Sequence, residues 1–172
     1  MGDKLQDKVM LVTGATSGMG RACARAFAAE GAKLAIAGRR KDRLGELKKE
    51  LGDGALELAG DVLDSATCEG WVEKTAKHFG GLDGLVNAAG VLGPGSAAET
   101  SNDEWDRIMN TNLRSVFVLT RAAIPHLSKR KGAVVNLSSV AGPRPYPNLL
   151  AYCVSKAALD QLTRCTALDL AP

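Results

Sequence analysis

The chain has 172 residues, of which 45% are hydrophobic, 24% charged and 4% aromatic. This is the composition of a globular protein with the length of one domain, and it excludes collagen, a coiled coil and a disordered chain. A domain of about 150 residues buries roughly 68–70% of its unfolded surface, so a core forms without disulfides or metals. The formal net charge of +3 is spread along the chain, which argues against a nucleic-acid partner.

The first residues and the cysteines favour a cytoplasmic protein. No apolar run reaches the roughly 18 residues of a membrane helix, and residues 1–6 lack a signal-peptide core and a myristoylation motif. We therefore expect no membrane partner. The four cysteines form no C-x-x-C pair and have no zinc spacing, so we expect small buried thiols and no metal site. They are Cys23, Cys68, Cys153 and Cys165.

Five short apolar runs, each closed by a small or polar residue, predict buried β-strands. The first run, Val9–Val12, is hydrophobic throughout, as expected of a strand that is covered on both faces. The five runs occupy residues 9–12, 34–37, 56–59, 84–87 and 133–137.

Helical patterns fill the segments between these runs. Ser101 and Glu104 have the spacing of a capping box and predict where one helix begins. Because strands and helices alternate, we expect an α/β fold with a doubly wound parallel sheet of five strands, in one domain over residues 1–172. The predicted helices cover residues 18–30, 41–51, 65–79, 103–127 and 150–170.

A glycine-rich turn joins the first predicted strand to the first predicted helix. Residues 13–20 read T-G-A-T-S-G-M-G, with the glycines spaced as G-x-x-x-G-x-G. Glycines let the backbone approach a pyrophosphate, and the N–H groups and dipole at a helix start attract the anion. A purely structural turn is the alternative, but the strand-turn-helix context favours nucleotide binding. The candidate cofactor-binding residues here are Gly14, Thr16, Ser17, Gly18, Met19 and Gly20.

The end of the second predicted strand indicates which nucleotide is bound. An acidic residue about 20 positions after the glycines would bind the ribose 2′-hydroxyl of NAD, but the sequence has Arg39 and Arg40 there. Two guanidinium groups favour a 2′-phosphate, so we expect NADP(H) rather than NAD(H). A solvated charged loop is the alternative. Asp61 and Val62 follow the third strand and are candidates for contact with the adenine, although an Asp there also suits an ordinary turn.

The last predicted helix carries a pair of residues that suits acid–base chemistry. Tyr152 and Lys156 are four residues apart, which places them on one face of the helix. A neighbouring ammonium favours the phenolate form of a tyrosine, so the pair can exchange a proton with a carbonyl or an alcohol near neutral pH. Taken alone, Y-x-x-x-K more often marks a surface tyrosine and lysine, but the surrounding motifs favour catalysis here.

Polar residues near the ends of the last two strands complete the candidate site. Ser138 and Ser139 close the fifth strand, where a hydroxyl can hold a substrate oxygen, although a plain turn would also explain them. Asn112 lies within a predicted helix at a place expected to be buried. Buried amides need partners, so either a structural network or a proton path would explain them. The residues after the fourth strand are Asn87, Ala88, Ala89 and Gly90.

These motifs, in this order, resemble those of the short-chain dehydrogenase/reductase family, and the match spans the whole chain. Ser139 rather than Ser138 matches the family serine, because it lies thirteen residues before Tyr152. The matching positions are 13–20, Asp61-Val62, 87–90, Asn112, Ser139 and Tyr152-x-x-x-Lys156.

The resemblance implies a Rossmann-like fold and NADP(H)-dependent hydride transfer between nicotinamide and a carbonyl or secondary alcohol. Tyr152 would be the general acid/base, with Lys156 favouring its phenolate form and holding the nicotinamide ribose. Ser139 would orient the carbonyl. Asn112 would carry a water between Lys156 and solvent, and Asn87 would support the sheet beside the cofactor.

Within the family the sequence is similar to 3-oxoacyl-carrier-protein reductase-like and hydroxysteroid dehydrogenase-like members. The resemblance therefore implies a small-molecule carbonyl or alcohol as the substrate. Family members often form homodimers or homotetramers, and we expect the same here through the predicted helices 103–127 and 150–170.

The sequence departs from the family pattern at its C-terminus. The family usually continues into further strands and a segment that covers the substrate, and we expect this C-terminal substrate-binding segment to be missing from the chain. An inactive cofactor-binding or oligomerising fragment is therefore the alternative function. A hydrolase is disfavoured, because no G-x-S-x-G motif occurs and His78 and His126 lie in helices predicted to be at the surface.

Overall fold

The computed structural model describes residues 2–52 and 54–171 and contains two compact units. Unit 1 comprises the residues up to Ala89 together with Val118–Val135. Unit 2 comprises Gly90–Phe117 and the residues from Asn136 onward. The expectation of one domain over the chain stays a prediction, since compact units within a chain need not fold separately.

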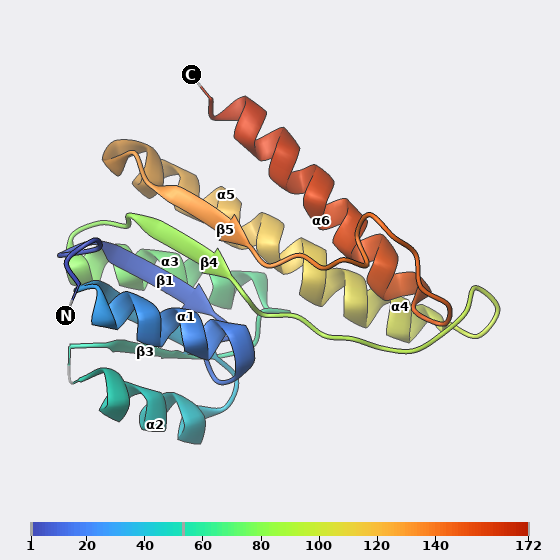
Figure 1. Cartoon of the computed structure of the whole chain (residues 1–172), viewed down its shortest axis with the longest axis horizontal. Helices are drawn as coiled ribbons and strands as arrows, with labels where there is room; N and C mark the ends of the chain where they lie inside the picture. Colours follow the sequence, from blue (N-terminus) through green and yellow to red (C-terminus); the bar gives the residue numbers. More distant parts are fainter. Residues whose placement is uncertain (1, 53, 172) are drawn as a thin grey trace. The chain divides into compact units, whose positions relative to one another are not determined.

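Unit 1 is built on a five-stranded sheet, which Figure 1 shows with its strand labels. The strands are ordered β3-β2-β1-β4-β5. The central strand β1 pairs in parallel with both β2 and β4, and Met10 of β1 lies opposite Leu34 and Gly84. All five predicted strands are present, with ends within one residue of the expected ones. They are β1 Val9–Thr13, β2 Lys33–Gly38, β3 Leu56–Ala59, β4 Gly84–Asn87 and β5 Ala133–Asn136.

Helices cover both faces of this sheet. α1 (Gly18–Ala29) packs on β1 and β2, and α2 (Lys41–Leu51) packs on β2, β3 and α1. α3 (Ser65–Phe79) and the unit 1 part of α5 (Ser115–Arg130) cover the other face, and Figure 1 shows α1 and α3 on opposite sides of β1. The predicted doubly wound, Rossmann-like α/β fold is thus confirmed. The core under α3 and α5 includes Val9, Leu11, Leu58, Trp71, Val72, Leu119 and Leu127.

Unit 2 contains α4 (Asn102–Met109), a π-helical turn η1 (Asn110–Arg114), the start of α5 and α6 (Leu150–Asp169). α6 packs against α4 and η1. The Ser101 hydroxyl accepts a hydrogen bond from the backbone N–H of Glu104 at 3.2 Å, as the capping box predicts.

The prediction of one α-helix over residues 103–127 is wrong in its middle and at its end. The π-helical turn η1 interrupts the helix, which then continues as α5 to Arg130. The side chain of Asn112 in η1 is bonded to residues outside the helix, and these tertiary bonds compensate for the disturbed ladder of backbone hydrogen bonds. Apolar periodicity carries no signal for such a turn.

Within the described residues, none of the helices has the length and apolar character that would let it span a membrane. The same residues contain no group of three or more His, Cys, Asp or Glu side chains that could hold a metal ion. Cys68 is buried and Cys23 and Cys153 are half-buried, but Cys165 is exposed on α6. The expectation of buried thiols is therefore wrong for Cys165, because its position falls on the outer side of the helix.

Candidate active site

The glycine-rich turn between β1 and α1 needs its glycines for space and for backbone conformation. Gly14 has a φ of +64°, and a Cβ there would lie 2.7 Å from backbone atoms of Ala88 and Ala89. Gly18 has a φ of +52°, but a Cβ there would meet nothing within 4 Å among the described residues. The turn is therefore packed against the chain at Gly14 and open at Gly18, where a bound group could approach the backbone.

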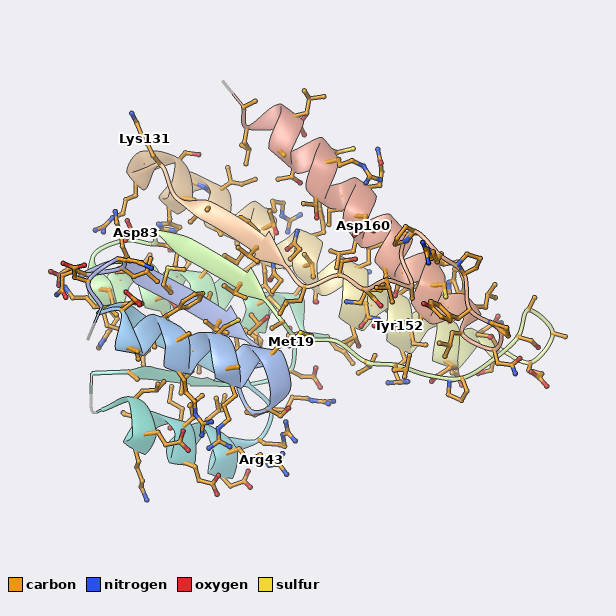
Figure 2. The ribbon with its side chains drawn as sticks, viewed as in Figure 1. Met19, Arg43, Asp83, Lys131, Tyr152 and Asp160 are labelled. Atoms are coloured by element: carbon orange, nitrogen blue, oxygen red, sulfur yellow. The ribbon has the colours of Figure 1, made fainter. Side chains whose placement is uncertain are left out.

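The start of α1 presents hydrogen-bond donors at this opening. The carbonyl of Ser17 accepts the first bond of the helix, from the N–H of Arg21 at 3.2 Å. The N–H groups of Gly18, Met19 and Gly20 therefore precede the helical ladder, at the positive end of the helix dipole. Met19 is 63% exposed and labelled in Figure 2. This arrangement suits a phosphate group.

Arg40 is bonded to the turn, whereas Arg39 points to an exposed carboxylate. The Nη2 of Arg40 donates to the Thr16 hydroxyl at 2.6 Å and to the Ser17 hydroxyl at 2.8 Å. Arg39 is two thirds exposed and lies 3.7 Å from a carboxylate oxygen of Asp61, a pair that is worth little at this exposure. Both guanidinium groups thus lie on the loop that the sequence assigned to the 2′-phosphate.

The residues after β3 and β4 are held by local contacts in unit 1. The Asp61 carboxylate accepts from the N–H of Leu63 at 3.1 Å, which is an Asx turn, and Val62 packs against the core. Asn87 is buried. The hydroxyl of Thr13 accepts from the N–H of Ala88 at 3.2 Å, a role that the sequence analysis missed because a threonine at a strand end carries no distinctive pattern.

In unit 2, α6 brings Tyr152 and Lys156 together. The Lys156 Nζ lies 5.9 Å from the centre of the Tyr152 ring and donates to the carbonyl oxygen of Leu137 at 2.7 Å. Lys156 is only 6% exposed. Burial holds the pKa of its ammonium below the usual range, and the negative charge of Asp160 acts in the opposite direction. Lys156 is therefore buried and Tyr152 half-buried, so the pair differs from an ordinary surface tyrosine and lysine.

Both ends of the Asn112 side-chain amide are hydrogen-bonded to neighbours in unit 2. Its side-chain oxygen accepts from the N–H of Val91 at 2.8 Å, and its Nδ2 donates to the Val91 carbonyl at 2.9 Å and to the Ser155 hydroxyl at 3.0 Å. A Cβ on Gly90 would lie 3.4 Å from the Asn112 oxygen and 3.9 Å from the Lys156 Nζ. These bonds form a structural network, and the predicted proton path through Asn112 stays a prediction.

Ser139 lies in a tight turn that follows β5. Its hydroxyl accepts from the N–H of Ala141 at 3.1 Å, and its carbonyl accepts from the N–H of Gly142 at 3.0 Å. Among the described residues the Ser139 hydroxyl only accepts, so its hydrogen can be donated to a substrate oxygen. The neighbouring Ser138 hydroxyl oxygen is buried and has no partner within the described part of the chain.

The structure thus groups the predicted site residues by unit. Unit 1 holds the candidate nucleotide-binding residues up to Ala89, and unit 2 holds Gly90 with the four candidate catalytic residues. A parallel sheet with an open glycine turn at a helix start is the construction of the dinucleotide-binding α/β proteins. The candidate catalytic residues are Asn112, Ser139, Tyr152 and Lys156.

Comparison with known proteins assigns the chain to one family within this class. The family model described as short chain dehydrogenase matches residues 8–172. A meso-2,3-butanediol dehydrogenase from Serratia marcescens is 39% identical over 167 residues, which is 96% of this chain and 66% of that protein. An uncharacterized oxidoreductase from Thermotoga maritima is 43% identical over 95% of this chain and 66% of that protein.

Solved structures agree with these matches. The crystal structure of a short chain dehydrogenase from Mycobacterium smegmatis superposes with a TM-score of 0.93 at 34% sequence identity, covering 98% of this chain and 73% of that chain. The chain belongs to the short chain dehydrogenase family, as the sequence motifs indicated. It spans about two thirds of the length of the curated relatives it matches.

Proposed function

We propose that this protein is an NADP(H)-dependent oxidoreductase that transfers a hydride between nicotinamide and a carbonyl or secondary alcohol. The observation that carries the proposal is the buried Lys156 ammonium one helical turn from Tyr152 on α6. Relatives that carry the names of dehydrogenases, among them a 3beta-hydroxysteroid dehydrogenase from Mediterraneibacter gnavus at 36% identity, support it. Carbonyl reduction consumes one hydride and one proton, and alcohol oxidation releases both.

The residues of unit 2 would supply the proton. In the direction of reduction, the Tyr152 hydroxyl donates its proton to the substrate oxygen, and in oxidation the phenolate takes it back. The Lys156 ammonium stabilises that phenolate, because an opposite charge nearby favours the ionised form. The Ser139 hydroxyl would donate a hydrogen bond to the same substrate oxygen and so orient the carbonyl. Asn112 would keep η1 in place against α6.

The residues of unit 1 would hold NADP(H), which supplies the hydride chemistry when bound. They fit such a cofactor, because a Cβ on Gly18 would meet nothing within 4 Å among the described residues, and the N–H groups at the start of α1 precede the helical ladder. Arg39 and Arg40 favour a 2′-phosphate over a free hydroxyl. Asp61 and Val62 would contact the adenine, and the segment from Asn87 to Gly90 would line the cofactor. We also propose a homodimer or homotetramer through the helices of 103–127 and 150–170.

The test is a comparison of two tyrosine variants of the 172-residue chain. Tyr152→Phe removes the proposed acid but keeps the ring, so we expect turnover of NADPH with a panel of ketones and diketones to fall by about 10²–10⁴-fold. Tyr146→Phe is the matched control, because Tyr146 is the other tyrosine of the chain and is exposed. Fluorescence titration with NADPH should give the same affinity for both variants.

Two results would count against the proposal. Equal turnover in both variants would remove Tyr152 from the mechanism. Binding of NADPH without turnover in the unmodified chain would instead support a cofactor-binding or oligomerising fragment, which is the alternative function.

A further inference from the structure

Asp160 is a half-buried carboxylate on α6 that the proposed chemistry does not use. It lies one helical turn after Lys156 and two turns after Tyr152, and Figure 2 labels both Asp160 and Tyr152 on this helix. Spacings of four and eight residues keep all three side chains on the same side of an α-helix. No hydrogen-bond donor within the described residues satisfies the Asp160 carboxylate.

The Asp160 carboxylate lies against the turn that carries Ser139. A Cβ placed on Gly142 would overlap the Oδ2 of Asp160 and would lie 3.3 Å from its Cγ. Gly142 itself closes the turn, because its N–H donates to the Ser139 carbonyl at 3.0 Å. Asp160 therefore lies directly against the turn, and the absence of a side chain at Gly142 is what makes this approach possible.

The same carboxylate acts on Lys156. The groups around the Lys156 Nζ in unit 2 are the Leu137 carbonyl, the Tyr152 ring, the Gly90 backbone and the neutral amide of Asn112. Within the described residues, the charged side chain whose field reaches the ammonium is Asp160, which favours the protonated form against the effect of burial.

We propose that Asp160 is a positioning residue of the candidate active site: its carboxylate lies against the turn of Ser139 and stands one helical turn from the Lys156 ammonium on the same side of α6. The proposal rests on the proposed function, since it assigns Asp160 to the machinery of that same site. It links the residue that would orient the substrate to the residue that would stabilise the tyrosine phenolate, through one side chain that touches neither substrate nor cofactor.

The first test measures Lys156 and needs no turnover. The protonation of Lys156 is followed by NMR of its ε-carbon across an alkaline pH series, with Lys156→Arg used to assign the resonance. In Asp160→Asn, which keeps the shape but removes the charge, we expect the titration to move to lower pH. Asp160→Glu keeps the charge and should restore it. Asp169→Asn is the matched control, because it removes an exposed carboxylate at the far end of α6.

A purely structural role for Asp160 makes a different prediction. In that case Asp160→Asn would lower the melting temperature but leave the Lys156 titration where it is in the unmodified chain, and the proposal would be overturned. If Asp160→Asn does not fold, Asp160→Ser takes its place in the same titration. Failure of the proposed function would appear separately, as absence of turnover in the unmodified chain, and would not alter the NMR result.

The second test uses activity. In Asp160→Asn, the loss of kcat at high pH should begin at lower pH than in the unmodified chain, because the ammonium is lost earlier. Gly142→Ala, which forces the Ser139 turn and the Asp160 carboxylate apart, should lower kcat by up to about 10²-fold. The affinity for NADPH should stay the same in both variants. A weaker affinity with an unchanged pH profile would contradict the assignment.

Discussion

The amide of Asn112 in η1 donates to the Ser155 hydroxyl of α6 at 3.0 Å, and Ser155 donates in turn to the carbonyl oxygen of Tyr152 at 2.8 Å. These two bonds connect the π-helical turn to the first turn of the helix that carries Tyr152 and Lys156. The position of the proposed catalytic pair in unit 2 therefore depends on an asparagine forty residues earlier in the chain.

Asn112→Leu should destabilise the protein strongly. It leaves the N–H and the carbonyl of Val91 without their partner and removes the donor to the Ser155 hydroxyl, which keeps its bond to the Tyr152 carbonyl. Each buried unpaired group costs about 1–3 kcal/mol. We expect a loss of about 3 kcal/mol in the free energy of unfolding by urea denaturation. Asn102→Ala, at an exposed position of α4, is the control and should change little. A loss below about 0.5 kcal/mol in Asn112→Leu would contradict the network.

The glycines of the chain offer a matched pair of substitutions. Gly14→Ala places a Cβ 2.7 Å from the Ala88 and Ala89 backbone at a positive φ, so it should lower the free energy of unfolding by about 2 kcal/mol or more. Gly45→Ala lies within α2 with nothing within 4 Å among the described residues, and it should raise this free energy by about 0.5–1 kcal/mol. Thermal melting checks both, and similar shifts in the two variants would refute the steric argument.

Arg39→Asp should shift the expected cofactor preference towards NADH. It replaces an exposed cation by a carboxylate that repels a 2′-phosphate and accepts from a ribose hydroxyl. We expect NADPH binding to weaken by about tenfold or more, with NADH binding relatively favoured. Paired fluorescence titrations measure this, and Lys49→Asp on α2 carries the same charge change as a control. An unchanged ratio of the two affinities would rule out a role for Arg39.

The order of the elements could be predicted because each leaves a local pattern. A run such as Leu34–Ala37 is apolar throughout, since a central strand is covered on both faces, and Ser101 marks the start of α4 by its capping spacing. The glycine turn could be found for the same reason, because Gly14 and Gly18 adopt backbone conformations that few other residues allow.

The remaining features depend on contacts that no local pattern records. The π-helical turn forms where Asn112 is bonded to Val91 and Ser155, residues that are distant in the sequence. Thr13 and Asp160 look like an ordinary strand end and an ordinary helix residue. Their contacts depend on the fold, which brings the Ala88 backbone to the Thr13 hydroxyl and the Gly142 backbone to the Asp160 carboxylate.

Asp83, labelled in Figure 2, should contribute to the stability of unit 1 through several bonds. Its carboxylate accepts from the N–H of Val9 at 2.9 Å and from Arg130 at 3.1 Å, and its side chain is 8% exposed. Asp83→Ala should cost about 2–4 kcal/mol, and Asp83→Asn less, because an amide oxygen still accepts from Val9. Urea denaturation tests this, with Asp7→Asn as the control: Asp7 is an exposed carboxylate at a φ of +61°, which an asparagine also tolerates, so the midpoint should change little.

Cys68 and Cys165 should differ in their reactivity and its dependence on pH. Burial, followed by the charges of Asp64, Asp61 and Glu69, raises the pKa of the Cys68 thiol from 9.0 to about 11. The folded state therefore keeps this thiol protonated while the unfolded state ionises it, so its contribution to stability is lost as the pH rises from about 9 towards 11.

Alkylation by iodoacetamide, read by peptide mass spectrometry at pH 8, should modify the exposed Cys165 first and leave Cys68 intact until the chain is unfolded in urea. Equal labelling of the two thiols in the folded protein would contradict the burial of Cys68 on the core-facing side of α3, where its Sγ lies 3.3 Å from the Val62 carbonyl oxygen.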